Sequence, residues 1–441
     1  MRTLLTVSAA LLLAAPVARG ADLLEIYRMA QAADATYAAA RATWSAGQER
    51  LPQGLSGLLP SANISADTQS TDRETRSRDP AVPPVDSRFS SNNASVSVTQ
   101  PLYRPQNFVT YQQAKAQVAQ SDAVFAQATQ DLILRIAQGY FDVLLAQDTI
   151  AFAQAQLVAI GRQLEQAKRN FEVGTATITD THEAQSRYDL TVSLEITARN
   201  DLEIRKRQLE LIIGRPAPGL SPLGPRFNPG QPEPAHPAVW VADAAHNNPQ
   251  VRIGQANLEF ATKEVERTRA GHSPTLDAFA TYTDSGNSTG VQSVAGVDTR
   301  TGVVGLRLQF PLYQGGLTSS RVREAIANEE KARQDLENAR RTAELTAQQT
   351  FLGVSSGVAQ VRALEAALVS SQSSLDSTRL GQEVGVRTQV DVLNAQQQLS
   401  QTRRDLAQAK YNYIFSLLRL KAAAGALTEQ DVSLVNSWLD R

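Results

Sequence analysis

The sequence predicts a mixed α/β membrane protein in which one unit of long helices and amphipathic strands occurs twice. Three observations lead to this fold class: the two halves of the 441-residue chain resemble each other, apolar residues recur at every seventh position, and four segments alternate apolar and polar residues. Seven-residue periods indicate helices that pack lengthwise as coiled coils. Alternation over about ten residues is typical of membrane strands with lipid on one face and water on the other.

The first 20 residues predict a signal peptide. Arg2 precedes an apolar run at 4–15, and Ala-Arg-Gly at 18–20 supplies small residues for cleavage before Ala21. The alternative, a buried apolar helix, fits this pattern less well. We expect the mature chain to leave the cytoplasm. We find no other run of about 20 apolar residues, so the sequence predicts no transmembrane helix, and a chain that crosses a membrane must then do so as a closed β-barrel.

The repeat is visible in two pairs of matching stretches. Gln-Pro-Leu-Tyr at 100–103 corresponds to Phe-Pro-Leu-Tyr at 310–313, and Val-Gly-Thr at 173–175 corresponds to Val-Gly-Val at 384–386. Between the copies, residues 214–237 contain eight of the 19 prolines, which excludes helix and strand interiors. We therefore expect four regions after the signal peptide. They are a first repeat at 21–213, a Pro-rich linker at 214–237, a second repeat at 238–427 and a C-terminal segment at 428–441.

Each repeat is expected to contain a shorter helix, two strands and a long helical hairpin. The seventh-position apolar series run over 136–171, 354–375 and 392–420. Because no proline interrupts 106–172, this range can form one helix of about 100 Å at about 1.5 Å per residue. Gly174 and Gly385 can adopt the left-handed conformation that ends a helix, so a second helix returns antiparallel in each repeat.

The alternating segments predict two strands per repeat. They lie at 62–67 and 94–99 in the first copy and at 275–282 and 304–310 in the second. Polar loops are expected between them, at 71–91 and 284–301, and suit the extracellular side. Four strands cannot close a pore, because the smallest outer-membrane barrels need about eight, so several chains must contribute to one barrel. Aromatic residues at the strand-to-helix junctions fit either an interfacial girdle or ordinary packing.

Composition excludes several classes of function. Lys and Arg total 43 against 44 Asp and Glu, so the chain lacks the basic excess of a nucleic-acid binder. It has no cysteine and only four histidines, none at metal-ligand spacing, so we expect no cofactor and no metal site. The Gly-x-Ser-x-Gly stretch at 353–357 lies inside a heptad helix rather than at a strand-to-helix turn. We therefore expect no enzymatic activity.

On these residues, and most specifically on 384–395 and 410–431, the chain resembles the TolC family of outer-membrane efflux and type I secretion channel proteins. The resemblance covers essentially the whole mature chain. It implies a homotrimer in which four transmembrane strands per chain form a shared 12-stranded barrel, continued by a long α-helical coiled-coil tunnel in the periplasm. It also implies an outer-membrane location in contact with lipid, a periplasmic adaptor (membrane fusion) protein and an inner-membrane transporter as partners, and a C-terminal segment near the equatorial region.

Asp180 and Asp391 occupy equivalent places, each three residues after a threonine, Thr177 or Thr388. The residues alone favour capping boxes at helix N-termini. A second interpretation is that symmetry gathers these acids into carboxylate rings at the narrow end of a tunnel, where they attract cations, and both interpretations can hold. The resemblance places the channel constriction on Asp391, with a second ring at Asn394, where a second acid is expected.

The resemblance also implies a latch that holds the constriction shut. It joins Thr179 or Asp180 on one hairpin to Arg387 and an aromatic residue on another. Arg387 can pair with a carboxylate or, alternatively, be a solvated charge at a helix end. Gln382 stands where Tyr is expected, so one latch is predicted to be altered or absent.

The leading hypothesis is a trimeric outer-membrane export duct. It would pass drugs, secreted proteins or both from the inner-membrane transporter and adaptor to the cell exterior. The alternative is a secreted coiled-coil scaffold or adhesin without a pore. The sequence leaves the cargo open.

Overall fold

The computed structural model describes residues 20–288 and 295–440, and the chain divides into two compact units. The first, here called the helical unit, is built from the described residues up to Arg41, from Phe125–Pro249 and from Arg340 onward. The second, the sheet unit, is built from Ala42–Val124 and Gln250–Ala339. Each unit therefore combines residues from both halves of the chain. Apart from Gly20, the predicted signal peptide lies outside the described residues.

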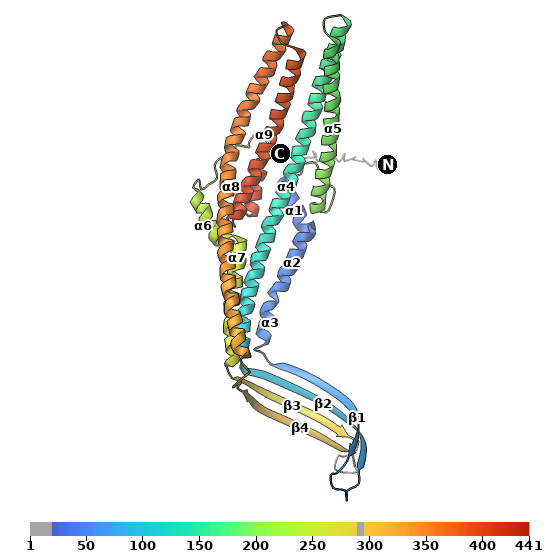
Figure 1. The fold of residues 1–441 in the computed structure, drawn as a ribbon, viewed down its shortest axis with the longest axis vertical. Coiled ribbons are helices and arrows are strands. Elements are labelled where there is room, and N and C mark those ends of the chain that lie inside the picture. The colour runs from blue at the N-terminus through green and yellow to red at the C-terminus, as the bar shows by residue number, and fades with distance from the viewer. Residues whose placement is uncertain (1–19, 289–294, 441) are drawn as a thin grey trace, which may run out of the picture. The chain divides into compact units, whose positions relative to one another are not determined.

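The described residues of the sheet unit form four antiparallel strands in the order β1-β2-β3-β4 (Figure 1). The strands are β1 (Ser61–Thr75), β2 (Val85–Tyr103), β3 (Thr275–Asn287) and β4 (Val297–Gln309). All four strands predicted from the alternation are confirmed. Because β2 pairs with β3, one sheet joins the two repeats. Within residues 20–288 and 295–440, the outer edges of β1 and β4 have no strand partner.

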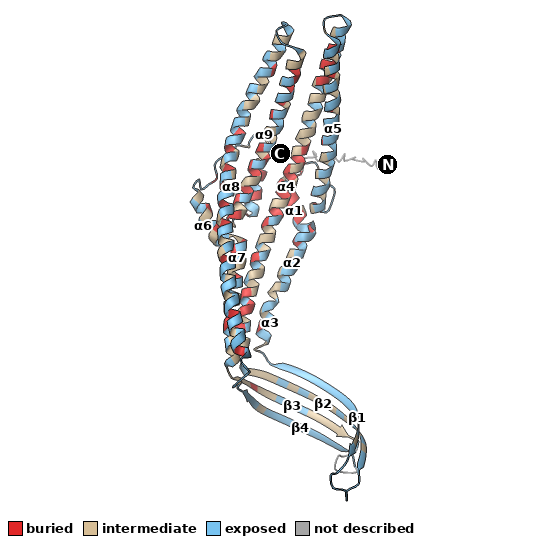
Figure 2. Ribbon diagram, in the orientation of Figure 1, coloured by how far each residue is buried: buried red, intermediate tan, exposed pale blue. Residues whose placement is uncertain are grey.

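Apolar side chains share one face of this sheet. Ile64 lies opposite Val96, and Val96 lies opposite Tyr282. On β4, Val304 lies opposite Ala280 and extends the same face. Ile64 is 81% exposed and Val304 is 86% exposed, and Figure 2 shows the strands almost entirely in the intermediate and exposed colours. Exposing an apolar face of this size to water is unfavourable, so the face requires a partner that covers it.

The loops between paired strands are shorter than the sequence predicted. Polar loops at 71–91 and 284–301 are wrong in extent, because all four strands continue into these ranges. Polar side chains pair across the strands there instead of leaving the sheet. Asp72 lies opposite Arg88 in a 2.6 Å ion pair. Asp284 lies opposite Arg300 in the second repeat, at 3.1 Å.

Helices complete the sheet unit and connect directly to its strands. They are α3 (Arg50–Ser56), most of α7 (Pro249–Arg269), the short η1 (Ala270–His272) and parts of α2 (Ala35–Gln48), α4 (Pro105–Glu172) and α8 (Leu317–Glu383). Arg104, between β2 and α4, donates from Nε to Asp277 Oδ1 at 2.7 Å and from Nη2 to Oδ2 at 2.6 Å. This bidentate pair fixes the first turn of α4 to the start of β3.

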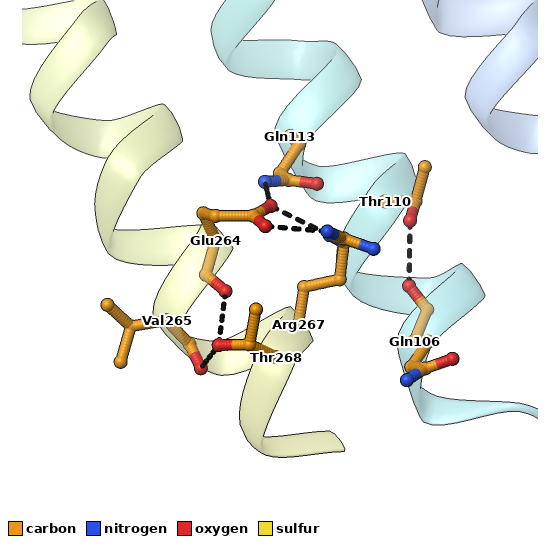
Figure 3. Close-up of polar contacts among 7 residues, drawn as sticks. All are labelled: Gln106, Thr110, Gln113, Glu264, Val265, Arg267 and Thr268. Atoms are coloured by element: carbon orange, nitrogen blue, oxygen red, sulfur yellow. Dashed lines mark hydrogen bonds and ion pairs between the residues drawn. The ribbon is translucent and has the colours of Figure 1, made fainter. Parts of the chain in front are cut away.

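A polar network joins α4 to α7 (Figure 3). Arg267 donates to both carboxylate oxygens of Glu264, at 2.7 and 2.6 Å, and Gln113 of α4 donates to Glu264 Oε2 at 2.8 Å. The hydrogen bonds from Arg267 lower the pKa of Glu264, and the bond from Gln113 adds to this effect against the opposing effect of burial. The ionised carboxylate is therefore the form that the fold prefers.

Replacing Glu264 with Gln should lower the thermal midpoint of the purified protein at neutral pH, and the difference should shrink in acid. The lowered pKa means that ionised Glu264 stabilises the fold above the ordinary Glu pKa of about 4.3, and this contribution is lost as pH falls through the lowered value. Calorimetry across this range measures the effect. Glu266→Gln is the control, because Glu266, whose side chain is more exposed than that of Glu264, pairs with Lys263 at 2.9 Å. A difference independent of pH would contradict the prediction.

The helical unit contains α1 (Leu23–Ala33), α5 (Ile178–Ile213), α6 (Pro237–Asn247), α9 (Gln389–Ala423), α10 (Glu429–Asn436) and the remaining parts of α2, α4 and α8. The helix predicted at 106–172 is confirmed, since α4 has 68 residues. Gly174 and Gly385 have φ of +76° and +79°, as predicted for helix-ending glycines. Their positive φ reverses the chain, so α5 follows α4 and α9 follows α8 as helical hairpins (Figure 1).

The core of the helical unit combines side chains from helices of both repeats, including α8, and holds the linker and both ends of the described chain. Tyr140 donates from its hydroxyl to the carbonyls of Ser221 at 2.7 Å and Ala21 at 3.2 Å. An isolated bridge pairs Leu223 with Leu439. The Pro-rich segment is therefore packed on the core at these points. The fully buried core side chains include Leu23, Ile26, Leu132, Ile136, Tyr140, Leu209, Ile213, Ile414 and Leu418.

The expectation that no helix is long and apolar enough to cross a membrane is wrong. Among the described residues, α4 contains an 18-residue window that is apolar enough, by length and composition, to cross a membrane. The sequence had predicted no such helix. Only 22% of that window is buried within the described residues, so packing in the core of the helical unit accounts for only part of its apolar content. Length and composition alone do not establish a membrane span.

Candidate constriction at the helical hairpin turns

The helical hairpins turn in the same way in both repeats. In the first, Thr175 and Ala176 donate their backbone N–H groups to the carbonyl of Asn170 at 2.8 and 3.2 Å. In the second, Val386 and Arg387 donate in the same way to the carbonyl of Gly381 at 2.9 and 3.1 Å. These bonds satisfy the final carbonyls of α4 and α8 and bring the chain to the start of the returning helix.

Both returning helices begin with the predicted capping box, which is confirmed. Asp391 Oδ2 accepts hydrogen bonds from the backbone N–H and the hydroxyl of Thr388, each at 2.9 Å. The backbone N–H of Asp391 donates to Thr388 Oγ1 at 3.2 Å. Asp180 and Thr177 repeat the arrangement at 2.9, 2.8 and 3.2 Å. The two carboxylates are thus held in equivalent positions at two helix N-termini.

The environment of Asp391 favours its ionised form. The backbone hydrogen bond from Thr388 lowers the pKa of Asp391, the hydroxyl bond adds to this, and the nearby charge of Arg387 contributes further. The carboxylate therefore remains negative well below neutral pH. It can serve as a helix cap and still offer its charge to a solvated ion.

The residues predicted for a latch lie on these turns without joining one another. Thr179 is exposed in the first turn of α5, and Arg387 is exposed between Gly385 and the Thr388 cap. Within the part of the chain that the structure describes, the Arg387 guanidinium has no hydrogen bond or ion pair to Thr179 or Asp180. Gln382 donates from Nε2 to Gln389 Oε1 at 2.7 Å, which is a bond inside its own hairpin.

Asn394 has a partner that the sequence did not predict. Arg187 of α5 donates from Nη2 to Asn394 Oδ1 at 3.1 Å and from Nη1 to Gln397 Oε1 at 2.8 Å. Arg187 lies seven residues after Asp180, so the helical period places both on one face of α5. This spacing could have indicated that Arg187 lies near the predicted constriction. The partner was not predictable, because the bond joins residues 207 positions apart.

The described residues of one chain contain no group of three or more His, Asp or Glu side chains arranged to hold a metal ion. At the starts of the returning helices, Asp180 and Asp391 each contribute a single carboxylate with its own threonine cap.

The four-stranded sheet and the two capped helical hairpins define the chain as an outer-membrane channel protein of TolC type. Comparison with known proteins assigns it more closely. The chain belongs to the outer membrane efflux protein family, whose profile matches residues 26–215 and 240–426, once in each repeat. It is a TolC-family efflux or secretion channel with a helical periplasmic portion, and not an enzyme. The alternative of a scaffold without a pore is therefore wrong.

The relatives include both efflux and secretion proteins. The chain is 33% identical over 439 residues to the outer membrane protein TolC of Vibrio cholerae, covering 99% of this chain and 98% of that protein. It is also 33% identical to the alkaline protease secretion protein AprF of Pseudomonas aeruginosa, covering 99% and 91%. The Campylobacter jejuni CmeC outer membrane channel shares the fold, with a TM-score of 0.77, 16% identity and coverage of 95% and 90%.

Proposed function

We propose that this chain forms a homotrimeric export duct in the outer membrane, in which twelve strands from three chains close one barrel. TolC-family channels are trimeric. The observation that carries the proposal is the sheet itself, whose two outer edges have no partner strand among the described residues and whose apolar face is exposed. In lipid, each unsatisfied backbone group costs several kcal/mol, so these edges require partners. The strands alternate in direction, so β4 of one chain meets β1 of the next in antiparallel fashion.

The apolar face of the sheet is proposed to contact lipid, with aromatic side chains at the inner boundary. Tyr103 and Phe108 are about half exposed near the β2–α4 junction, and Tyr313 is 87% exposed at the equivalent junction of the second repeat. Aromatic rings are enriched at the edges of the apolar band in outer-membrane barrels. The helical unit then extends into the periplasm, where the adaptor and the inner-membrane transporter would dock.

Cysteine cross-linking should test the trimer, because the chain has no native cysteine. Ser65→Cys on β1 is combined with Val303→Cys or Gly305→Cys on β4, since these positions lie on the same face of the sheet. Oxidation should produce dimers and trimers on non-reducing gels only when both cysteines are present. Each single variant is the control. A monomer by mass photometry that still forms conducting channels would contradict the assembly.

The turns of the helical hairpins are proposed to form the constriction at the periplasmic end. Three copies of Asp391 would make a carboxylate ring there, with Asp180 as a second acid and Asn394 at the next level. What supports this is the pair of fixed, solvent-accessible carboxylates at equivalent turns. The Arg387 guanidinium is exposed and is proposed to latch onto Thr179 or Asp180 of a neighbouring hairpin. Gln382 is bonded inside its own hairpin, which supports the proposal that one latch is altered or absent.

The cargo is proposed to include secreted proteins, with drugs as a second class. AprF and the proteases secretion protein PrtF of Dickeya chrysanthemi, 33% and 30% identical to this chain, are named for protease secretion. A deletion strain, and the same strain carrying the gene, would be tested for extracellular protease and for drug susceptibility. Loss of secreted protease with unchanged susceptibility supports a dedicated secretion duct, and the reverse result supports drug efflux instead.

A further inference from the structure

The contact between Arg187 and Asn394 places a cation at the level where the second acid is missing. Asn394 lies three residues after Asp391, on the same face of α9 and one turn further into the helix. The Arg187 guanidinium lies 3.1 Å from its side-chain oxygen and 2.8 Å from that of Gln397, the next residue on this face. One guanidinium therefore donates to the side-chain amides of both Asn394 and Gln397 on this face of α9.

The charge on Arg187 is only partly balanced within the chain. Glu183, one turn earlier on α5, has a carboxylate oxygen 3.7 Å from Arg187 Nη2, and the two side chains are 36% and 30% exposed. This is a longer, partly solvated pair, whereas both bonds to α9 are shorter and go to neutral amides. A neutral amide accepts the guanidinium bond without cancelling its charge. Arg187 therefore brings a guanidinium charge to the level of Asn394 that Glu183 offsets only in part.

We propose that Arg187 is a specificity-determining residue of the constriction, which confines cation attraction to Asp391. This inference rests on the proposed constriction at the hairpin turns. Through its bonds to α9, Arg187 places a positive charge at the level where a second acid would attract cations, and it fixes the orientation of Asn394. Three copies would then place three guanidinium groups one turn beyond the Asp391 ring. Cations would be held at one level only, and anionic cargo would meet a smaller barrier.

Under this proposal, the effect of placing an acid at position 394 depends on whether Arg187 is present. Placing an acid at position 394 alone should strengthen cation block only slightly, because the new carboxylate would pair with the guanidinium already beside it. Restoring the acid while removing the guanidinium should create a second ring. The two substitutions are therefore expected to be strongly non-additive, which is the signature of direct coupling.

The test is block of single-channel current by La³⁺ applied from the periplasmic side to the full-length protein in planar bilayers. Asn394→Asp alone should tighten block by less than about threefold, whereas Arg187→Gln with Asn394→Asp should tighten it by about tenfold or more. Arg199→Gln removes an equivalent charge from α5 at a pair with Glu195 and should leave block unchanged. Every variant is first checked for heat-resistant trimers, so that folding failures are recognised.

Two different results would each overturn one proposal, the first the role of Arg187 and the second the constriction itself. If Asn394→Asp alone tightens block as much as the double variant, Arg187 does not set the charge at this level and the inference is overturned. If Asp391→Asn leaves block unchanged, the constriction itself is elsewhere, and the proposed function of these turns fails.

Discussion

Asp391→Asn should remove most of the block that multivalent cations impose on the channel from the periplasmic side. Three carboxylates would be lost from one ring, so the apparent affinity for a trivalent cation should fall by about tenfold to a hundredfold. Because hydrogen bonds from Thr388 lower the pKa of Asp391, the carboxylate stays ionised below the ordinary range, and block of the unmodified channel should persist in mildly acidic solution. Titrations of block against pH in planar bilayers measure both effects.

Two matched variants separate the charge of Asp391 from its role as a helix cap. Thr388→Ala removes the hydroxyl that accepts from the Asp391 backbone but leaves the carboxylate in place. It should destabilise the start of α9 by about 1 kcal/mol and change block little. Thr177→Ala removes the equivalent hydroxyl from the cap of the first hairpin and also leaves the carboxylate in place. If Asp391→Asn changes stability as Thr388→Ala does and leaves block intact, Asp391 is only a cap.

Gly425→Ala should be the most damaging small substitution in the helical unit. Gly425 follows the end of α9 with φ +71°, and an added Cβ would lie 2.2 Å from the carbonyl oxygen of Asn247. The clash is with backbone at the corner between α6 and α7, which cannot move aside as a side chain can. Left-handed backbone costs about 1–2 kcal/mol for an ordinary residue, and overpacking adds about 1–3 kcal/mol.

Two other glycines provide controls for Gly425. Gly385→Ala has the same backbone penalty at φ +79° but meets nothing within 4 Å, so it should cost only about 1–2 kcal/mol. Gly353→Ala, inside α8 with open space around it, should be neutral or stabilising by up to about 1 kcal/mol. Thermal unfolding followed by circular dichroism ranks the three. Equal losses for Gly425→Ala and Gly385→Ala would show that the contact with Asn247 is unimportant.

Local sequence patterns predicted the elements of the fold well where the governing interactions are local. Strand alternation located all four strands, but it underestimated their length, because Asp72–Arg88 and Asp284–Arg300 pair across strands that look like loops in the sequence. The Thr-x-x-Asp spacing predicted both capping boxes for the same reason, since donor and acceptor are three residues apart. The domain limits and the constriction role of Asp391 remain predictions.

The sequence by itself determined the repeat, the long helices, the four strands, the glycine turns and the caps, because each depends on the periodicity or chemistry of neighbouring residues. Only the tertiary structure decided which side chains meet across the repeats. The pairing of β2 with β3, the attachment of the linker through Tyr140, and the bond from Arg187 to Asn394 all join residues far apart in the chain. Such contacts depend on how whole helices and strands pack, and no local pattern specifies the partner.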